Sequence, residues 1–115
     1  MLLSVIIVNY NVRHFLSQCL DSIYNSDKNT SDGEMELEVF VVDNNSTDGS
    51  VEWIREHYPQ VRLIANVDNP GFAKANNQAL RQAKGDHLLL LNPDTLVERD
   101  TFVKCINFYR QNPEC

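Results

Sequence analysis

The stretch EVFVVDNNSTDGS, Glu38 to Ser50, decides the fold that the sequence predicts. It opens as a continuous apolar run, which is typical of a strand covered on both faces. The run turns polar at Asp43, and Ser46, Thr47 and Asp48 are all suited to cap a helix that begins just after them. A buried strand that leads directly into a helix is the first half of a βαβ unit.

The same alternation continues along the rest of the chain. Three more short apolar runs predict strands, at residues 4–8, 61–65 and 87–91. Apolar stripes at helical spacing predict four helices, over residues 15–24, 51–58, 72–83 and 102–109, the third with Phe72 in the core and Gly85 as its C-cap. This order predicts a single α/β domain over residues 1–115, with a doubly wound, mostly parallel sheet and helices on both faces. The polar segment 25–36 is predicted to be a flexible surface loop.

Composition and charge narrow the classes of function. The chain has 115 residues and a formal net charge of -6, and its basic residues are scattered singly. This distribution argues against a nucleic-acid partner. Cys19, Cys105 and Cys115 form no CxxC pair, which indicates a reducing compartment, and Cys19 and Cys105 are predicted to be small buried residues of helices.

The apolar start of the chain does not read as a targeting segment. MLLSVIIV has no basic residues before it and is followed by polar residues, unlike a signal peptide. It is also far shorter than the ~20 apolar residues of a membrane-spanning helix. We therefore expect a cytoplasmic protein, with peripheral contact at the inner face of the membrane as an open alternative.

The fold pattern indicates where ligands bind, because ligands of such sheets lie outside the carboxyl ends of the strands. Four polar segments follow the predicted strands, at residues 9–11, 43–45, 66–70 and 92–94. Fingerprints of other nucleotide sites are missing from the sequence: no GxGxxG follows the first strand and no GxxxxGK[ST] occurs.

Each polar segment has a structural and a functional interpretation. Asp43 either belongs to a turn or accepts a hydrogen bond from a ligand N–H. Since neighbouring residues already suffice to cap the helix, Asp43 is left without a structural task, which favours the ligand. Tyr10 is either a half-buried packing residue or a platform for a flat ring. Asn76 and Asn77 are poor helix formers, and either orient a loop or bind a ligand. Asp94 either belongs to a β-turn or binds a divalent cation through oxygen.

Four motifs in this order resemble the N-terminal half of a glycosyltransferase family 2 domain, which has the inverting GT-A fold. They are LSVIIVNYN, VFVVDNNSTDGS, NPGFAKANNQAL and GDHLLLLNPDT. The resemblance implies a nucleotide-sugar site, with a UDP- or dTDP-sugar as donor and a glycan or lipid-linked acceptor in cell-surface polysaccharide synthesis. The form of the NPD and NPGF motifs is similar to rhamnosyltransferase-like members.

The resemblance also implies roles for particular residues. Val8, Tyr10, Asp43 and Asn76 would bind the nucleotide, with Tyr10 against the pyrimidine. Asn92 and Asp94 would hold Mg²⁺ or Mn²⁺ against the diphosphate, and Asn92 departs from the Asp that is usual at the first position of this DxD motif.

The resemblance covers a family domain only in part. Its general base would lie beyond Cys115, so the chain is expected to be a truncated, donor-binding portion that is inactive alone. Such a truncation would leave a sheet edge open, so self-association is expected. Two other classes of protein are alternatives to a glycosyltransferase. One is a nucleotidyltransferase, and the other is a non-catalytic module that binds a nucleotide or another partner.

Overall fold

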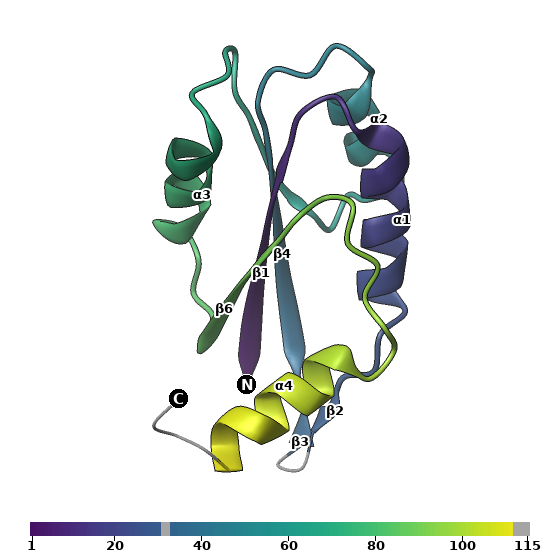
Figure 1. Cartoon of the computed structure of the whole chain (residues 1–115), viewed down its shortest axis with the longest axis vertical. Coiled ribbons are helices and arrows are strands. Elements are labelled where there is room, and N and C mark those ends of the chain that lie inside the picture. The colour runs from purple at the N-terminus through teal and green to yellow at the C-terminus, as the bar shows by residue number, and fades with distance from the viewer. Residues whose placement is uncertain (31–32, 112–115) are drawn as a thin grey trace.

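A four-stranded parallel sheet forms the centre of the molecule in a computed structural model that describes residues 1–30 and 33–111. Its strands are β1 (Leu2–Asn9), β4 (Glu36–Asp43), β5 (Arg62–Ala65) and β6 (His87–Leu91), in the order β5-β4-β1-β6. All three pairings are parallel. The predicted α/β fold with a parallel sheet is confirmed (Figure 1).

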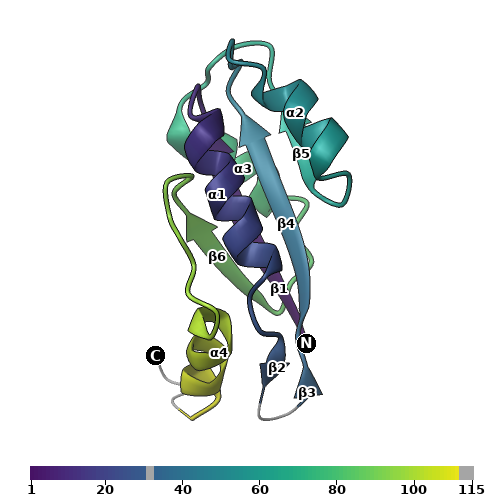
Figure 2. The ribbon, with the colours of Figure 1, turned by 90° about the vertical axis from the view of Figure 1, so that its right-hand side faces the viewer.

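Helices cover both faces of this sheet (Figures 1 and 2). On one face lie α1 (Arg13–Tyr24) and α2 (Ser50–His57), and α3 (Phe72–Leu80) lies on the other. The last helix, α4 (Thr101–Gln111), packs its buried residues into the same core as α1. The alternation of strand and helix therefore gives the doubly wound arrangement that the sequence predicts.

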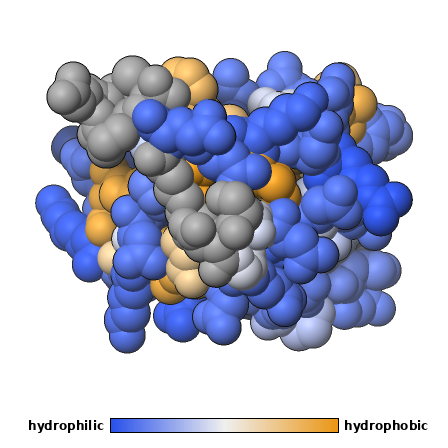
Figure 3. All heavy atoms as spheres, turned by 90° about the horizontal axis from the view of Figure 1, so that it is seen from below, coloured by the Kyte–Doolittle hydropathy of each residue, from blue (hydrophilic) through white to orange (hydrophobic). Residues whose placement is uncertain are grey.

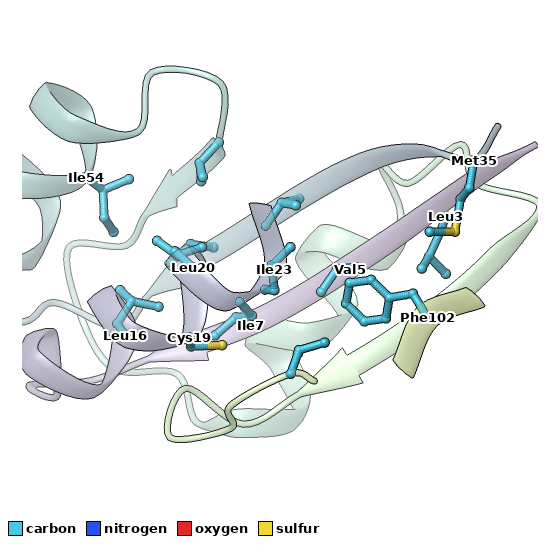
Figure 4. Close-up of a cluster of buried hydrophobic side chains, with 14 of the residues drawn as sticks. Leu3, Val5, Ile7, Leu16, Cys19, Leu20, Ile23, Met35, Ile54 and Phe102 are labelled. Atoms are coloured by element: carbon cyan, nitrogen blue, oxygen red, sulfur yellow. The ribbon is translucent and has the colours of Figure 1, made fainter. Parts of the chain in front are cut away.

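The larger core lies between the sheet and α1 (Figure 4). Alternate residues of β1 point into it, and α1 contributes residues spaced by three and four positions, as an amphipathic helix does. The fully buried members from these two elements are Val5, Ile7, Leu16, Cys19, Leu20 and Ile23. The other residues of β1 face α3, where Ala75 and Ala79 meet Ile6 and Val8. Thus β1 is buried on both faces, as its continuous apolar run predicts.

Strand β6 departs from that prediction, although its run of leucines is just as continuous. Leu89 and Leu91 pack against the larger core, whereas Leu88 and Leu90 are 51% and 49% exposed. The reason is that α3 packs mainly on β1 and β4, which leaves this face of the edge strand partly open in the described part of the chain. Self-association through this edge stays a prediction.

The segment 25–36 includes two short strands, β2 (Asn29–Thr30) and β3 (Gly33–Glu34), which pair antiparallel. Ser26 and Met35 at its two ends are buried. Its predicted flexibility is untested, and Ser31 and Asp32 lie outside the described residues.

Gly85 does not cap a helix, contrary to the prediction. Helix α3 ends at Leu80, and Gly85 lies against the start of β1. A Cβ atom at Gly85 would lie 2.5 Å from Ser4 Oγ and 2.7 Å from the Ser4 nitrogen. Gly85 N–H donates to Ser4 Oγ at 2.9 Å. Glycine is therefore required here because two segments of backbone approach each other closely.

The cysteines also differ from one another in the structure. Cys19 is buried, as predicted, whereas Cys105 is exposed because it lies on the outer side of α4. Burial, together with the negative charge of Asp94, raises the pKa of the Cys19 thiol to about 11.

We expect iodoacetamide at pH 8 to modify Cys105 readily and Cys19 roughly 100-fold more slowly, since the thiolate is the reacting form. Mass spectrometry of the tryptic peptides measures both rates. In 6 M guanidinium chloride the two rates are expected to converge. Modification of Cys19 in the folded protein at the rate of Cys105 would contradict this prediction.

Candidate nucleotide and metal site

The carboxyl ends of the strands are held together by backbone hydrogen bonds that continue past the sheet. Asn9 lies opposite Asp43 in the parallel register of β1 and β4. Asn44 N–H donates to the Asn9 carbonyl at 2.9 Å, and Asn66 N–H donates to the Asp43 carbonyl at 2.9 Å. The polar segments after β1, β4 and β5 therefore lie side by side, as the sequence predicts from the fold pattern.

Asp43 has a structural task, which the sequence interpretation missed. Its carboxylate is fully buried. Oδ1 accepts hydrogen bonds from Asn9 Nδ2 at 2.9 Å and from Ser46 Oγ at 2.7 Å, and Oδ2 accepts one from Ser46 N–H at 2.8 Å. The Asp43 carboxylate thus closes the turn after β4 and ties it to β1.

Further side chains fasten the loop after β1 to the loop after β4. Ser46 Oγ accepts from Asn11 N–H at 2.9 Å, and Asn11 Oδ1 accepts from Thr47 N–H at 2.7 Å. Asp48 accepts from Arg13 N–H at 2.9 Å and from Ser50 N–H at 3.1 Å. Partial burial would raise the pKa of the Asp48 carboxyl, but the Ser50 hydroxyl, which also donates to Asp48, and these backbone N–H bonds hold that pKa below the usual value. The amide-rich loops are therefore fixed relative to one another before any ligand binds.

A cleft of about 400 Å³ opens beside these loops, on the face of the sheet that carries α3. Tyr10 and Phe72 are its two aromatic residues, and they are 50% and 57% exposed. The full lining is Val8, Tyr10, Val12, Asn44, Asn69, Gly71, Phe72 and Pro93. Apolar and aromatic walls with a few amide groups are typical of small-molecule sites.

The turn after β6 brings the predicted metal ligands next to this cleft. Thr95 N–H donates to the Asn92 carbonyl at 3.0 Å, so residues 92–95 form a β-turn. Pro93 lines the cleft, and Asn92 and Asp94 are exposed. The β-turn interpretation of this motif is therefore correct, and it leaves the side-chain oxygens of Asn92 and Asp94 open to solvent.

Asn92 and Asp94 fit a metal that takes most of its ligands from elsewhere. Among residues 1–30 and 33–111 there is no group of three or more His, Cys, Asp or Glu that could hold a metal ion. Mg²⁺ is commonly bound through one or two carboxylates together with water and substrate phosphates. One carboxylate and one amide oxygen are compatible with that kind of site and not with an all-protein cage.

The structure brings some of the predicted site residues together and separates others. Val8 and Tyr10 line the cleft, whereas Asp43 does not. Asn76 is also buried outside the lining, and its Nδ2 donates to the Phe72 carbonyl at 3.2 Å. Phe72 itself, which was predicted to be in the core, is exposed at the start of α3. Its position directly after the Pro70-Gly71 turn was the available signal, because it puts Phe72 at the very start of the helix, one turn before the residues that pack on the sheet.

A model of the protein family "Glycosyl transferase family 2" matches residues 4–115. The poly(ribitol-phosphate) beta-glucosyltransferase of Bacillus spizizenii is 30% identical over 116 residues, which cover 97% of this chain and 18% of that protein. The chondroitin synthase of Escherichia coli is 31% identical over 114 residues, which cover 96% of this chain and 16% of that protein. The chain thus spans less than a fifth of the length of these relatives.

Solved structures show the same fold. The crystal structure of S. aureus TarS 1–349 in complex with UDP-GlcNAc superposes with a TM-score of 0.84 at 27% identity, over 98% of this chain and 33% of that one. A mannosyltransferase from Pyrobaculum calidifontis in complex with GDP-Man and Mn²⁺ superposes with a TM-score of 0.80 at 33% identity, over 93% of this chain and 32% of that one.

Proposed function

Because the chain belongs to glycosyl transferase family 2, we propose that it forms the donor-binding portion of an enzyme that transfers a sugar from a nucleoside-diphosphate sugar to an acceptor hydroxyl, with inversion. The observation that carries this proposal is the cleft between Tyr10 and the β-turn that holds Asp94. One side of the cleft suits a nucleobase and the other suits a metal-bound diphosphate.

The nucleobase would lie in the cleft against Tyr10, with Val8 beneath it. An exposed tyrosine ring offers a flat apolar face at low entropic cost, and stacking on such a face is tolerant of base identity. Asn69 is exposed and adds an amide group to the edge of the cleft. These features support binding of a nucleoside without fixing which one.

Asn92 and Asp94 would hold Mg²⁺ or Mn²⁺. A divalent cation at this turn would neutralise the charge that develops on the departing nucleoside diphosphate. Among the residues that the structure describes, no lysine or arginine lines the cleft. The chain's own contribution is to hold the two side chains on a turn that the Thr95 N–H and the Asn92 carbonyl close and whose Pro93 lines the cleft.

For Asp43 and Asn76 the proposal is less direct. Asp43 would contact a ring N–H only through Oδ2, the oxygen that accepts a single hydrogen bond, and only after the Ser46 loop opens, because the carboxylate is fully buried. Asn76 would act on the nucleotide through Phe72, whose carbonyl it binds.

Calorimetric titration tests this function. We expect UDP to bind in the presence of Mn²⁺, and we expect Asp94→Ala to lower that affinity by about tenfold or more, which is ~1.4 kcal/mol. Binding of uridine, which has no phosphates, should not change in the variant. Asp68→Ala removes an exposed carboxylate that follows β5 instead of β6 and is the matched control.

Two outcomes would contradict the proposal. The first is that neither UDP nor dTDP nor GDP binds with either metal, which would favour a non-catalytic interaction module. The second is that Asp94→Ala binds UDP and Mn²⁺ as tightly as the parent chain. Comparison of UDP with dTDP also tests the rhamnosyltransferase-like assignment, since that assignment favours dTDP.

The wider setting is part of the same proposal. The matched relatives include a poly(ribitol-phosphate) glucosyltransferase and a chondroitin synthase, which supports a glycan or lipid-linked acceptor and a role in polysaccharide synthesis. None of the helices in residues 1–30 and 33–111 is long and apolar enough to cross a membrane. Contact with the inner face of the membrane remains a proposal, as does activity at the cytoplasmic side.

A further inference from the structure

Phe72 is an aromatic residue whose exposure the fold does not explain. It is the first residue of α3 and is 57% exposed, while Ala75 and Ala79 of the same helix are fully buried against the sheet. A single exposed apolar side chain on a surface is ordinary. Phe72 differs because it lines the same cleft as Tyr10, which is 50% exposed.

The backbone around Phe72 is held by three amide side chains. Asn69 Oδ1 accepts from Gly71 N–H at 3.0 Å, and Asn44 Nδ2 donates to the Gly71 carbonyl at 3.4 Å. Asn76 Nδ2 donates to the Phe72 carbonyl at 3.2 Å. Gly71 takes φ = +95°, a conformation that L side chains rarely adopt. The turn therefore fixes the start of α3, and with it the position of the Phe72 ring beside the cleft.

This arrangement explains a feature of the sequence that helix propensity disfavours. Asn76 lowers the helix propensity of α3, yet it holds the carbonyl of the residue that carries the exposed ring. Asn44, which directly follows β4, links the turn to that strand, and Asn66, which follows β5, donates from its Nδ2 to Asn44 Oδ1 at 3.0 Å. The amide side chains thus connect the Phe72 turn to the same strand ends that carry Tyr10 and Asp43.

We propose that Phe72 supplies a second aromatic contact for the donor's nucleobase, so that the base in the cleft packs against both Tyr10 and Phe72. The proposal rests on the proposed function, because it names a second residue for the nucleoside part of the same site. The two rings come from separate elements, the loop after β1 and the first turn of α3. Both rings line one cleft, so a flat ring that enters it has an aromatic side chain available from each element.

Titration of UDP and of uridine, each with Mn²⁺, tests Phe72→Ala, Phe72→Leu and Phe72→Tyr. One base–aromatic contact is commonly worth about tenfold or more in affinity. We therefore expect Phe72→Ala to lower the affinity for UDP and the affinity for uridine by about that same factor. Phe72→Leu keeps apolar volume without a flat ring and should lose most of the same affinity. Phe72→Tyr keeps the ring and should bind as the parent chain does.

The control is Phe108→Ala, which removes another exposed phenyl ring, 54% exposed, from α4. It should leave both affinities unchanged. In the proton NMR spectrum of the complex, the uracil H5 and H6 resonances should move upfield in the parent chain and less so in Phe72→Ala. Far-UV circular dichroism and the fluorescence of Trp53, the single tryptophan, establish that each variant is folded.

The two proposals fail in different ways. Suppose that the parent chain binds UDP with Mn²⁺, and that a folded Phe72→Ala or Phe72→Leu variant binds uridine as tightly as the parent chain binds uridine. The inference about Phe72 is then wrong and the proposed function stands. If the parent chain binds none of the nucleotides, the proposed function fails and the inference fails with it.

Discussion

Replacing Asp43 with alanine is expected to lower the free energy of unfolding by about 3 kcal/mol, because one buried donor and one partly buried donor lose their acceptor. These donors are Asn9 Nδ2, at 2.9 Å from the carboxylate, and Ser46 N–H, at 2.8 Å. Neither donor has another acceptor within 3.0 Å in the described structure; Asn9 Nδ2 has only Ser46 Oγ at 3.4 Å as a second partner. The Ser46 hydroxyl also donates to Asp43, but it can rotate to a new partner.

Urea unfolding followed by the fluorescence of Trp53 measures this loss. Asp43→Asn keeps the volume of the side chain and one acceptor oxygen but turns an NH₂ group toward one of the donors, so it should lose only part of this stability. Asp68→Ala, at an exposed carboxylate after β5, should change stability by no more than about 0.5 kcal/mol. If Asp43→Ala unfolds within about 1 kcal/mol of the parent chain, the carboxylate does not hold the turn as described.

This result bears on how nucleotide binding is tested. A loss of binding in Asp43→Ala would follow either from a lost contact with the base or from an opened loop. Asp94 and Phe72 are exposed at the surface, outside the buried network around Asp43. Variants at these two positions therefore report on the ligand more directly than variants at Asp43.

The strands and helices follow from local patterns in the sequence. The run at residues 38–43 predicts β4, and the stripe of Leu16, Cys19, Leu20 and Ile23 predicts the buried side of α1, because both patterns depend only on neighbouring residues. The order of these elements then limits the topology, since parallel strands require crossover connections. For these reasons the parallel sheet and the position of the strand ends were predictable.

The details of the site depend on contacts between distant residues, and the sequence does not contain them in local form. The role of Asp43 requires Asn9 to lie opposite it in the sheet. The exposure of Leu88 and Leu90 depends on which strands α3 covers. Gly85 is needed because of Ser4, which is 81 positions away. In each case the deciding neighbour is set by the fold and not by the spacing of residues along the chain.

Replacing Phe102 with alanine is expected to lower the free energy of unfolding by about 3–5 kcal/mol. Phe102 is fully buried and packs in the larger core with Leu3 and Met35 (Figure 4). Its ring connects α4 to the amino ends of β1 and β4. Truncation removes the ring's apolar area from the core and leaves a cavity that the surrounding strands cannot fill, since they are fixed by the hydrogen bonds of the sheet.

Phe108→Ala is the matched control, because it removes the same ring from an exposed position of the same helix. Seen from the end of the molecule that lies at the bottom of Figure 1, the surface is mostly hydrophilic, with separate hydrophobic side chains between (Figure 3). We expect Phe108→Ala to change the free energy of unfolding by no more than about 1 kcal/mol, as substitutions at exposed sites usually do. Equal losses in the two variants would mean that Phe102 does not anchor α4.

Hydrogen exchange shows whether the loss in Phe102→Ala is local or global. Two residues of α4, Phe102 and Ile106, are buried in the larger core, and β1 is paired on both sides and covered on both faces. If α4 opens before the sheet, amide protection should fall over residues 101–111 far more than over β1. Equal loss of protection in β1 would mean that α4 and the sheet unfold as one cooperative unit. In the first case the strand ends that carry Tyr10, Asp43 and Asp94 keep their arrangement when α4 detaches, and UDP binding should survive in this variant.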